Sequence, residues 1–116
     1  LGFLYGTIIV GEAHDPAHHS RNVCVFADGE VDRCPTGTGV SARAAIHYAR
    51  GELAQDEPFV VESILGTTFT GKVVEEVQFG PHSAVVPEVT GSAHICGRAE
   101  WLVDPQDPLR HGFILR

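Results

Sequence analysis

Residues 32–53, DRCPTGTGVSARAAIHYARGEL, decide the fold class, because here a Gly-rich turn runs directly into the one convincing helix of the chain. We predict that helix over residues 40–53, with Gly51 as its C-terminal stop. Arg43 and His47 fall on one stripe of the helix, and small apolar residues cover most of the remainder. So many small apolar residues predict a helix that a close-packed sheet buries on most sides.

Segments rich in β-branched and aromatic residues precede and follow the helix, and each is typical of a short strand. One helix among many short strands predicts an α+β domain, with a curled mixed or antiparallel β-sheet, or a barrel, wrapped around one central helix. We expect a single domain over residues 1–116, whose last strand (112–116) belongs either to this domain or to a neighbouring one. The strand segments are residues 4–10, 22–26, 59–64, 67–79, 83–88, 92–102 and 112–115.

The composition fits one globular domain and excludes several functions. The 116 residues are 43% hydrophobic and 20% charged. Eight basic and fifteen acidic residues give a formal net charge of −7, which disfavours binding to nucleic acid. The longest nearly apolar run, residues 1–10, is half of the roughly 20 residues that a membrane span needs. Three cysteines without a disulfide-framework spacing indicate a reducing, cytoplasmic setting.

The turn before the helix has the chemistry of an anion site. A helix N-terminus leaves several backbone N–H groups unpaired at the positive end of the helix dipole. Gly37 and Gly39 would let a carboxylate or phosphate approach these groups, and Thr36, Thr38 and Ser41 add hydroxyls. The alternative is that Thr38 or Ser41 caps the helix and the glycines only make a tight turn. The residues alone leave both interpretations open.

A second polar cluster, HDPAHH at residues 14–19, raises the question of a metal site. His14 and His18 would share a face only on a helix, and Pro16 between them argues against one. We interpret the segment as a solvated loop and expect no metal site in the chain.

Residues 32–39 also resemble the second active-site motif of the proline racemase family, which usually reads Asp-Arg-Ser-Pro-Cys-Gly-Thr-Gly. Further similarities follow in the family's order, at residues 4–7 and 20–28, at 62–71 and at 104–113. The resemblance implies a lobe like that of diaminopimelate epimerase, taken from the C-terminal part of a two-lobed, cofactor-free enzyme. A chain that has no Met and opens on a strand-like segment fits such a part of a longer protein.

The resemblance implies an amino acid substrate of the proline or hydroxyproline type. In the racemases a Cys from each lobe faces the α-carbon, but the position of the second Cys is Thr36 here. A Thr there resembles trans-3-hydroxy-L-proline dehydratase, with Thr36 as the catalytic residue of this lobe. Asp32 matches the acid that binds the ring nitrogen, and Phe26 matches an aromatic residue against the ring. Substrate binding would also involve Gly37, Thr38 and Gly39, whose backbone N–H groups would hold the carboxylate.

Other functions remain open at this stage. Cys34, two residues before Thr36, could act as a displaced acid or base, which would preserve 4-hydroxyproline epimerase or proline racemase activity. A binding module that captures small carboxylates without turnover is the alternative outside enzymes. Either way, we expect the 116-residue chain alone to be inactive, and to form a homodimer or self-associate.

Overall fold

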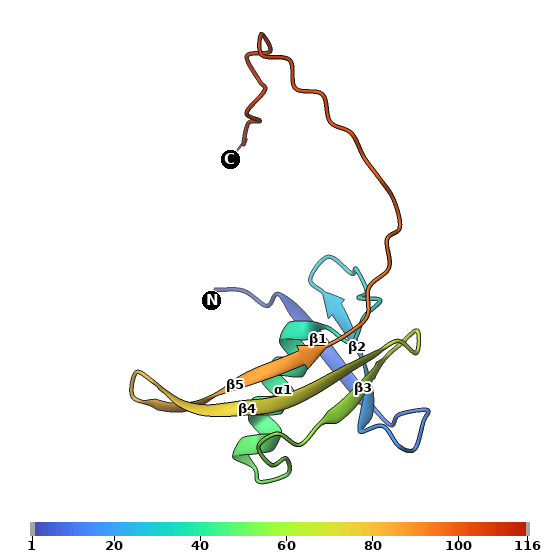
Figure 1. The fold of residues 1–116 in the computed structure, drawn as a ribbon, viewed down its shortest axis with the longest axis vertical. Coiled ribbons are helices and arrows are strands. Elements are labelled where there is room, and N and C mark those ends of the chain that lie inside the picture. Colours follow the sequence, from blue (N-terminus) through green and yellow to red (C-terminus); the bar gives the residue numbers. More distant parts are fainter. Residues whose placement is uncertain (1, 116) are drawn as a thin grey trace.

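The computed structural model describes residues 2–115, and these form one mixed five-stranded sheet with a single helix (Figure 1). The predicted α+β class is confirmed, but the sheet is open, and it does not close into a barrel. In chain order the elements are β1 (Gly6–Gly11), β2 (Ser20–Phe26), α1 (Gly37–Ala49), β3 (Phe59–Ser63), β4 (Thr68–Phe79) and β5 (His82–Thr90).

The spatial order of the strands follows the chain, from β1 to β5. Three neighbouring pairs are antiparallel, and only β2 and β3 run parallel, with Ser20 opposite Val61. A parallel pair needs a long crossover, and α1 supplies it between these two strands. Residues 27–36 separate β2 from α1, and Val31 bridges back to Val25, so the segment that leads into the Gly-rich turn lies beside β2.

The core lies between α1 and the sheet. Val61 and Val73 are fully buried on β3 and β4, and Val40 and Ala44 meet them from the helix. A Cβ on Gly71 would come within 2.9 Å of Val40 and within 2.6 Å of Phe59. The absence of a side chain at Gly71 thus allows the helix and the sheet to approach closely.

The helix begins earlier than predicted, at Gly37, and ends at Ala49. It begins earlier because the glycines of the turn form its first turn instead of preceding it. It ends earlier because Gly51 adopts a left-handed conformation (φ +71°) and donates its N–H to the carbonyl of Tyr48 at 2.9 Å. Gly51 is therefore confirmed as the stop signal.

The expectation that the sheet buries the helix on most sides is wrong. Ala42 and Ala49 are exposed, and Ile46 keeps 47% of its surface exposed. The charged stripe points instead toward the sheet, where Arg43 donates to the hydroxyl of Ser20 at 2.8 Å. The open sheet covers only one side of α1, and the exposed stripe formed by Ala42, Ile46 and Ala49 lies on the other side.

The strands predicted at residues 92–102 and 112–115 are also wrong. From residue 91 onward the described chain has turns but no strand, and it leads away from the sheet (Figure 1). A strand needs a neighbour for its backbone N–H and C=O groups, and this tail has none beside it within residues 2–115. Arg116, the last residue of the predicted strand, lies outside the described residues. Among residues 2–115, no helix is long and apolar enough to cross a bilayer.

Candidate active site

Three hydrogen bonds from two different elements fix the turn that leads into α1. The N–H of Asp32 donates to the carbonyl of Cys24 on β2 at 3.0 Å. The buried side-chain amide of Asn22, also on β2, donates to the carbonyl of Pro35 at 2.9 Å. Thr67, in the β3–β4 turn, donates its hydroxyl to the carbonyl of Arg33 at 3.3 Å, which ties the other side of the motif.

The turn brings together Asp32 and Thr36, two residues that the sequence predicts in the site. The Thr36 hydroxyl donates to Oδ2 of Asp32 at 2.9 Å. Partial burial raises the pKa of Asp32, but the hydrogen bonds from Thr36 and Cys34 outweigh this effect and leave the pKa below its usual value. Asp32 is therefore an anion at neutral pH, and it accepts hydrogen bonds in a site that is partly shielded from water.

Cys34 bridges the same pair. Its thiol donates to Oδ1 of Asp32 at 3.3 Å, and its sulfur accepts the backbone N–H of Thr36 at 3.3 Å. Burial raises the pKa of the Cys34 thiol, and the adjacent Asp32 carboxylate raises it further although the Thr36 N–H opposes this. The thiol is therefore protonated at neutral pH.

Thr36 itself has an unusual backbone, with φ at +68°. This left-handed conformation is rare for a β-branched residue and costs on the order of 1–3 kcal/mol. The hydrogen bonds of Cys34 and the three bonds that fix the turn hold the residue in this conformation. Such strain is common where a side chain must point in one particular direction.

The first turn of α1 presents unpaired backbone donors. Its first intrahelical bond runs from the N–H of Val40 to the carbonyl of Thr36 at 2.9 Å, so the preceding N–H groups have no helical partner. Neither predicted cap is formed, because Ser41 donates its hydroxyl to the carbonyl of Gly37 at 2.9 Å and Thr38 is exposed within the helix. No acidic residue lies in the first turn, and no side chain caps it. The helix end can thus accept an anion.

The two glycines of the motif have different surroundings. A Cβ on Gly37 would meet nothing within 4 Å, so this side of the turn is open to a ligand. A Cβ on Gly39 would lie 2.1 Å from the end of the Ile8 side chain on β1. Gly39 is buried, and its lack of a side chain makes room for β1 and not, as the sequence suggests, for a ligand.

Phe26, the remaining predicted residue, lies at the end of β2. Its ring packs edge to face on Tyr5, with the ring centres 5.5 Å apart, beside a hollow lined by residues 3, 5, 26–28 and 30. Cys24, whose backbone carbonyl accepts the Asp32 N–H, is two residues away along the same strand. Phe26 is thus a neighbour of the motif along β2, although its ring packs in a separate aromatic cluster.

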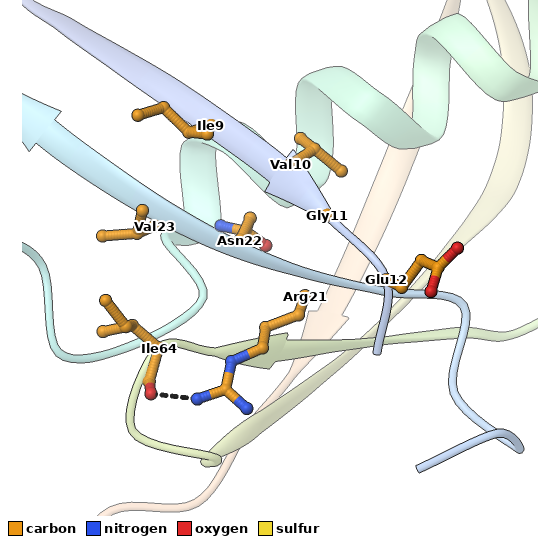
Figure 2. A pocket seen from close by; sticks show the side chains of 8 residues that line it. All are labelled: Ile9, Val10, Gly11, Glu12, Arg21, Asn22, Val23 and Ile64. Atoms are coloured by element: carbon orange, nitrogen blue, oxygen red, sulfur yellow. Dashed lines mark hydrogen bonds between the residues drawn. The ribbon is translucent and has the colours of Figure 1, made fainter. Parts of the chain in front are cut away.

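A second hollow lies between β1, β2 and Ile64, and its lining is mostly apolar (Figure 2). Its one cationic group, the guanidinium of Arg21, donates to the carbonyl of Ile64 and to the ring of His14. Asn22 lies in the same lining and reaches from there to Pro35. Asn22 therefore connects the lining of this hollow to the motif, whereas the unpaired backbone N–H groups lie at the N-terminal end of α1.

The polar loop between β1 and β2 is folded around a buried carboxylate. Glu62 is 4% exposed and accepts the N–H groups of His14 and Asp15 at 3.0 and 2.9 Å, as well as Nδ1 of His18 at 2.9 Å. These bonds lower the pKa of Glu62 to about 2, the two backbone bonds having the largest effect. Among residues 2–115, no three His, Cys, Asp or Glu side chains are grouped to hold a metal ion.

Sequence reasoning missed Asn22 and Thr67 as supports of the site. Both lie more than ten positions from the carbonyls that they bind, and nothing local in the sequence marks them as partners. The only available signal is that Asn22 is an amide in the predicted strand 22–26, whose other residues are apolar. A buried amide of this kind requires a hydrogen-bond partner.

The fold, an open mixed sheet that carries one helix, is similar to part of solved structures of a hydroxyproline epimerase and a probable proline racemase. The crystal structure of a hydroxyproline epimerase from Agrobacterium vitis, with bound trans-4-hydroxy-L-proline, matches with a TM-score of 0.75 at 34% identity. The match covers 96% of this chain and 31% of that one.

The family model for proline racemase matches residues 1–114, and the chain belongs to the proline racemase family. A trans-3-hydroxy-L-proline dehydratase from Colwellia psychrerythraea is 48% identical over 116 residues, which are all of this chain and 33% of that protein. A 3-hydroxyproline 2-epimerase from Burkholderia multivorans is 53% identical over 116 residues and is covered to 35%. The chain thus spans about a third of the length of these relatives.

Proposed function

We propose that this chain supplies one side of the active site of a trans-3-hydroxy-L-proline dehydratase. The observation that carries the proposal is Thr36 at the position of the second racemase thiol, with its hydroxyl on Asp32 at 2.9 Å. An aliphatic hydroxyl is a far weaker acid than a thiol, whose pKa is about 8.5. Thr36 therefore cannot return a proton to the α-carbon as a Cys would, and two-thiol racemisation is disfavoured.

Elimination needs only one base at the α-carbon. A thiolate in the part of the protein outside this chain takes the α-proton, and the C–H electron pair forms the bond between the α-carbon and C3. The C3–O bond breaks at the same stage, and the leaving oxygen takes up the proton that the thiol has gained and departs as water, which regenerates the thiolate. The resulting enamine acid tautomerises to Δ1-pyrroline-2-carboxylate. No net oxidation or reduction occurs, so the reaction as written uses no redox cofactor.

The residues of this lobe have separate roles in the proposal. Asp32, which is ionised, accepts a hydrogen bond from the ring ammonium. The N–H groups of Gly37, Thr38 and Gly39 hold the substrate carboxylate at the helix end. Thr36 hydrogen-bonds the 3-hydroxyl and orients it for departure, and Phe26 lies beside the ring.

A 2-epimerase acting on 3-hydroxyproline is the second candidate, because the relative with that name is 53% identical to this chain. In that case another acid would return a proton to the opposite face of the α-carbon. The two functions differ in their products, one being an imine that has lost water and the other a diastereomer.

We further propose that the chain is the C-terminal lobe of a longer enzyme. The exposed stripe Ala42, Ile46 and Ala49 on α1, together with the tail from residue 91, would be covered by the rest of the protein. The three cysteines are unpaired, which suits a reducing compartment such as the cytoplasm.

The test is to incubate the full-length protein with trans-3-hydroxy-L-proline and to measure the formation of Δ1-pyrroline-2-carboxylate. Thr36→Val keeps the shape of the side chain but removes the hydroxyl, and we expect a loss of about a hundredfold or more in kcat/KM. Thr36→Ser, the matched control, keeps the hydroxyl and should lie within about tenfold of the wild type. A Thr36→Val variant as active as the wild type would remove Thr36 from the mechanism.

A further inference from the structure

Cys34 occupies the place between the two groups that the proposed function requires, and both contacts of its sulfur are with them. We propose that Cys34 is a positioning residue, whose side chain links the Asp32 carboxylate to the strained backbone of Thr36. This role rests on the proposed function of Asp32 and Thr36. It assigns Cys34 no proton transfer to or from substrate.

The geometry requires a side chain that donates and accepts at the same point. Oδ1 of Asp32 accepts a hydrogen bond from the thiol at 3.3 Å, and the sulfur accepts one from the backbone N–H of Thr36 at 3.3 Å. Pro35 between them is fully buried, and its carbonyl is fixed by Asn22, so the turn cannot readily move to find other partners. A Ser side chain has the same two capacities, whereas Ala has neither.

The link determines how much of Asp32 is available for a ligand. Oδ1 accepts both the backbone N–H and the thiol of Cys34, and Oδ2 accepts the Thr36 hydroxyl. An ionised carboxylate has about four acceptor sites, so Oδ2 keeps one for an incoming ammonium or ring N–H. With Oδ1 fixed by Cys34, this free acceptor points in one direction.

The same contacts argue against Cys34 as a displaced acid or base. The Cys34 thiol already donates a hydrogen bond to the Asp32 carboxylate. Burial and the charge of Asp32 raise the pKa of the thiol and keep it protonated. A thiol in this state is a poor nucleophile and a poor base at neutral pH. Cys96, by comparison, is an exposed free thiol in the tail of the same chain.

The first experiment compares Cys34→Ala with Cys34→Ser in the full-length protein, with Cys96→Ala as the control for loss of a thiol. Loss of the thiol donor should raise the pKa of Asp32, so we expect the acid limb of the kcat/KM profile to move to higher pH in Cys34→Ala. We also expect KM to rise about tenfold while kcat changes less, because Asp32 binds the ring nitrogen throughout the reaction. Cys34→Ser should restore both values. An unshifted acid limb in Cys34→Ala, or a Ser variant as impaired as the Ala variant, overturns the proposal.

Two readouts are independent of turnover, and the second, made on the wild type, is also independent of variant folding. Pyrrole-2-carboxylate carries a ring N–H and a carboxylate, and calorimetry should show the same order of affinity: wild type and Cys34→Ser above Cys34→Ala. In the wild type, iodoacetamide should label Cys34 at least about tenfold more slowly than it labels glutathione in the same solution at pH 7.5, by mass spectrometry. Equal labelling rates would show a free Cys34 thiol and overturn the proposal. Absent dehydration with the expected affinities and labelling would instead overturn the proposed function alone.

Discussion

At the residue scale, the hydrogen bond between Thr36 and Asp32 determines whether the Thr36 hydroxyl donates or accepts a hydrogen bond at the substrate. Thr36 donates its one hydroxyl proton in a hydrogen bond to Oδ2 of Asp32, so the lone pairs of the Thr36 oxygen are open to a ligand. A substrate hydroxyl that donates to Thr36 is thereby oriented, and the lone pairs of its oxygen stay open to the proton that it takes up as it departs. Replacing this oxygen with a thiol changes the chemistry, because a thiol can give a proton to carbon.

We therefore expect Thr36→Cys in the full-length protein to gain epimerase or racemase activity. Two thiols would then face the α-carbon, as in the racemases that the motif resembles. The measurement is the incorporation of deuterium into inverted L-proline or 4-hydroxyproline in deuterated water, by NMR. We expect a rate at least about tenfold above that of the wild type. A wild type that already inverts these substrates efficiently would contradict the account.

The anion site is tested at Gly37, where an added Cβ meets nothing within 4 Å. Gly37→Val should leave the fold intact but place a branched side chain beside the unpaired N–H groups. We expect the affinity for pyrrole-2-carboxylate to fall about tenfold or more, by calorimetry. Gly11→Val, also in open space but at the end of β1, is the matched control. Unchanged affinity in a folded Gly37 variant would remove the site from this turn.

Local sequence predicts the chemistry of this motif but not all of its packing. The residues that pair in space, Asp32 and Thr36, are four apart, and the resemblance already groups them. The contact of Gly39 with Ile8 spans thirty-one positions, since 39 minus 8 is 31, and it depends on how β1 lies against the helix. That arrangement follows from the tertiary fold, so local sequence does not predict that the missing side chain of Gly39 makes room for Ile8.

At the element scale, α1 has its polar stripe turned toward the sheet. Arg43 reaches Ser20, and His47 packs its ring against Phe59, with centres 5.9 Å apart. Periodicity shows that a helix has two faces, but here it does not tell which face meets the sheet. The positions of β1 to β5 were predictable from their β-branched and aromatic residues. The predicted tail strands failed because pairing is a property of two segments.

The β1–β2 loop gives a prediction on stability and pH. Glu62 accepts the N–H groups of His14 and Asp15, and Glu62→Gln replaces one of its oxygens with a donor. We expect residues 11–20 to exchange their amide hydrogens about tenfold faster in this variant, by mass spectrometry on the full-length protein. Glu75→Gln, on an exposed carboxylate of β4, should leave the exchange unchanged.

The pH dependence of the loop has a definite sign. The folded pKa of Glu62, about 2, lies below its ordinary value of 4.5. The ionised carboxylate therefore stabilises the loop fully above pH 4.5, and this contribution is lost as the pH falls toward 2. Loop protection that stayed constant as the pH fell from 4.5 to 2 would contradict this assignment.

At the scale of the whole molecule, the chain spans about a third of its relatives, and residues 2–115 leave apolar surface uncovered in several places, two of which lie on α1 and in the tail. One is the helix stripe around Ile46, which is 47% exposed. The other is the tail, in which Ile95, Trp101 and Leu102 are at least 86% exposed. Surfaces of this kind are usually covered by another part of the protein or by another copy.

We expect the 116-residue chain alone to be catalytically silent and to self-associate. Its motif offers only Thr36, an occupied Asp32 and a protonated Cys34, and none of these is a base for an α-proton. Ile46→Lys should reduce the association, as measured by the sedimentation of the purified chain. Dehydration by the chain free of full-length protein would place the base in this lobe and contradict the assigned roles.

The most direct test of the central claim is to follow the full-length protein with trans-3-hydroxy-L-proline in deuterated water by NMR. One spectrum resolves both outcomes, because the imine and the 2-epimer have different signals. The account predicts that Δ1-pyrroline-2-carboxylate accumulates and that no deuterated 2-epimer appears. Accumulation of a 2-epimer with deuterium at the α-carbon as the main product would contradict it, since a second acid would then be returning a proton where Thr36 cannot.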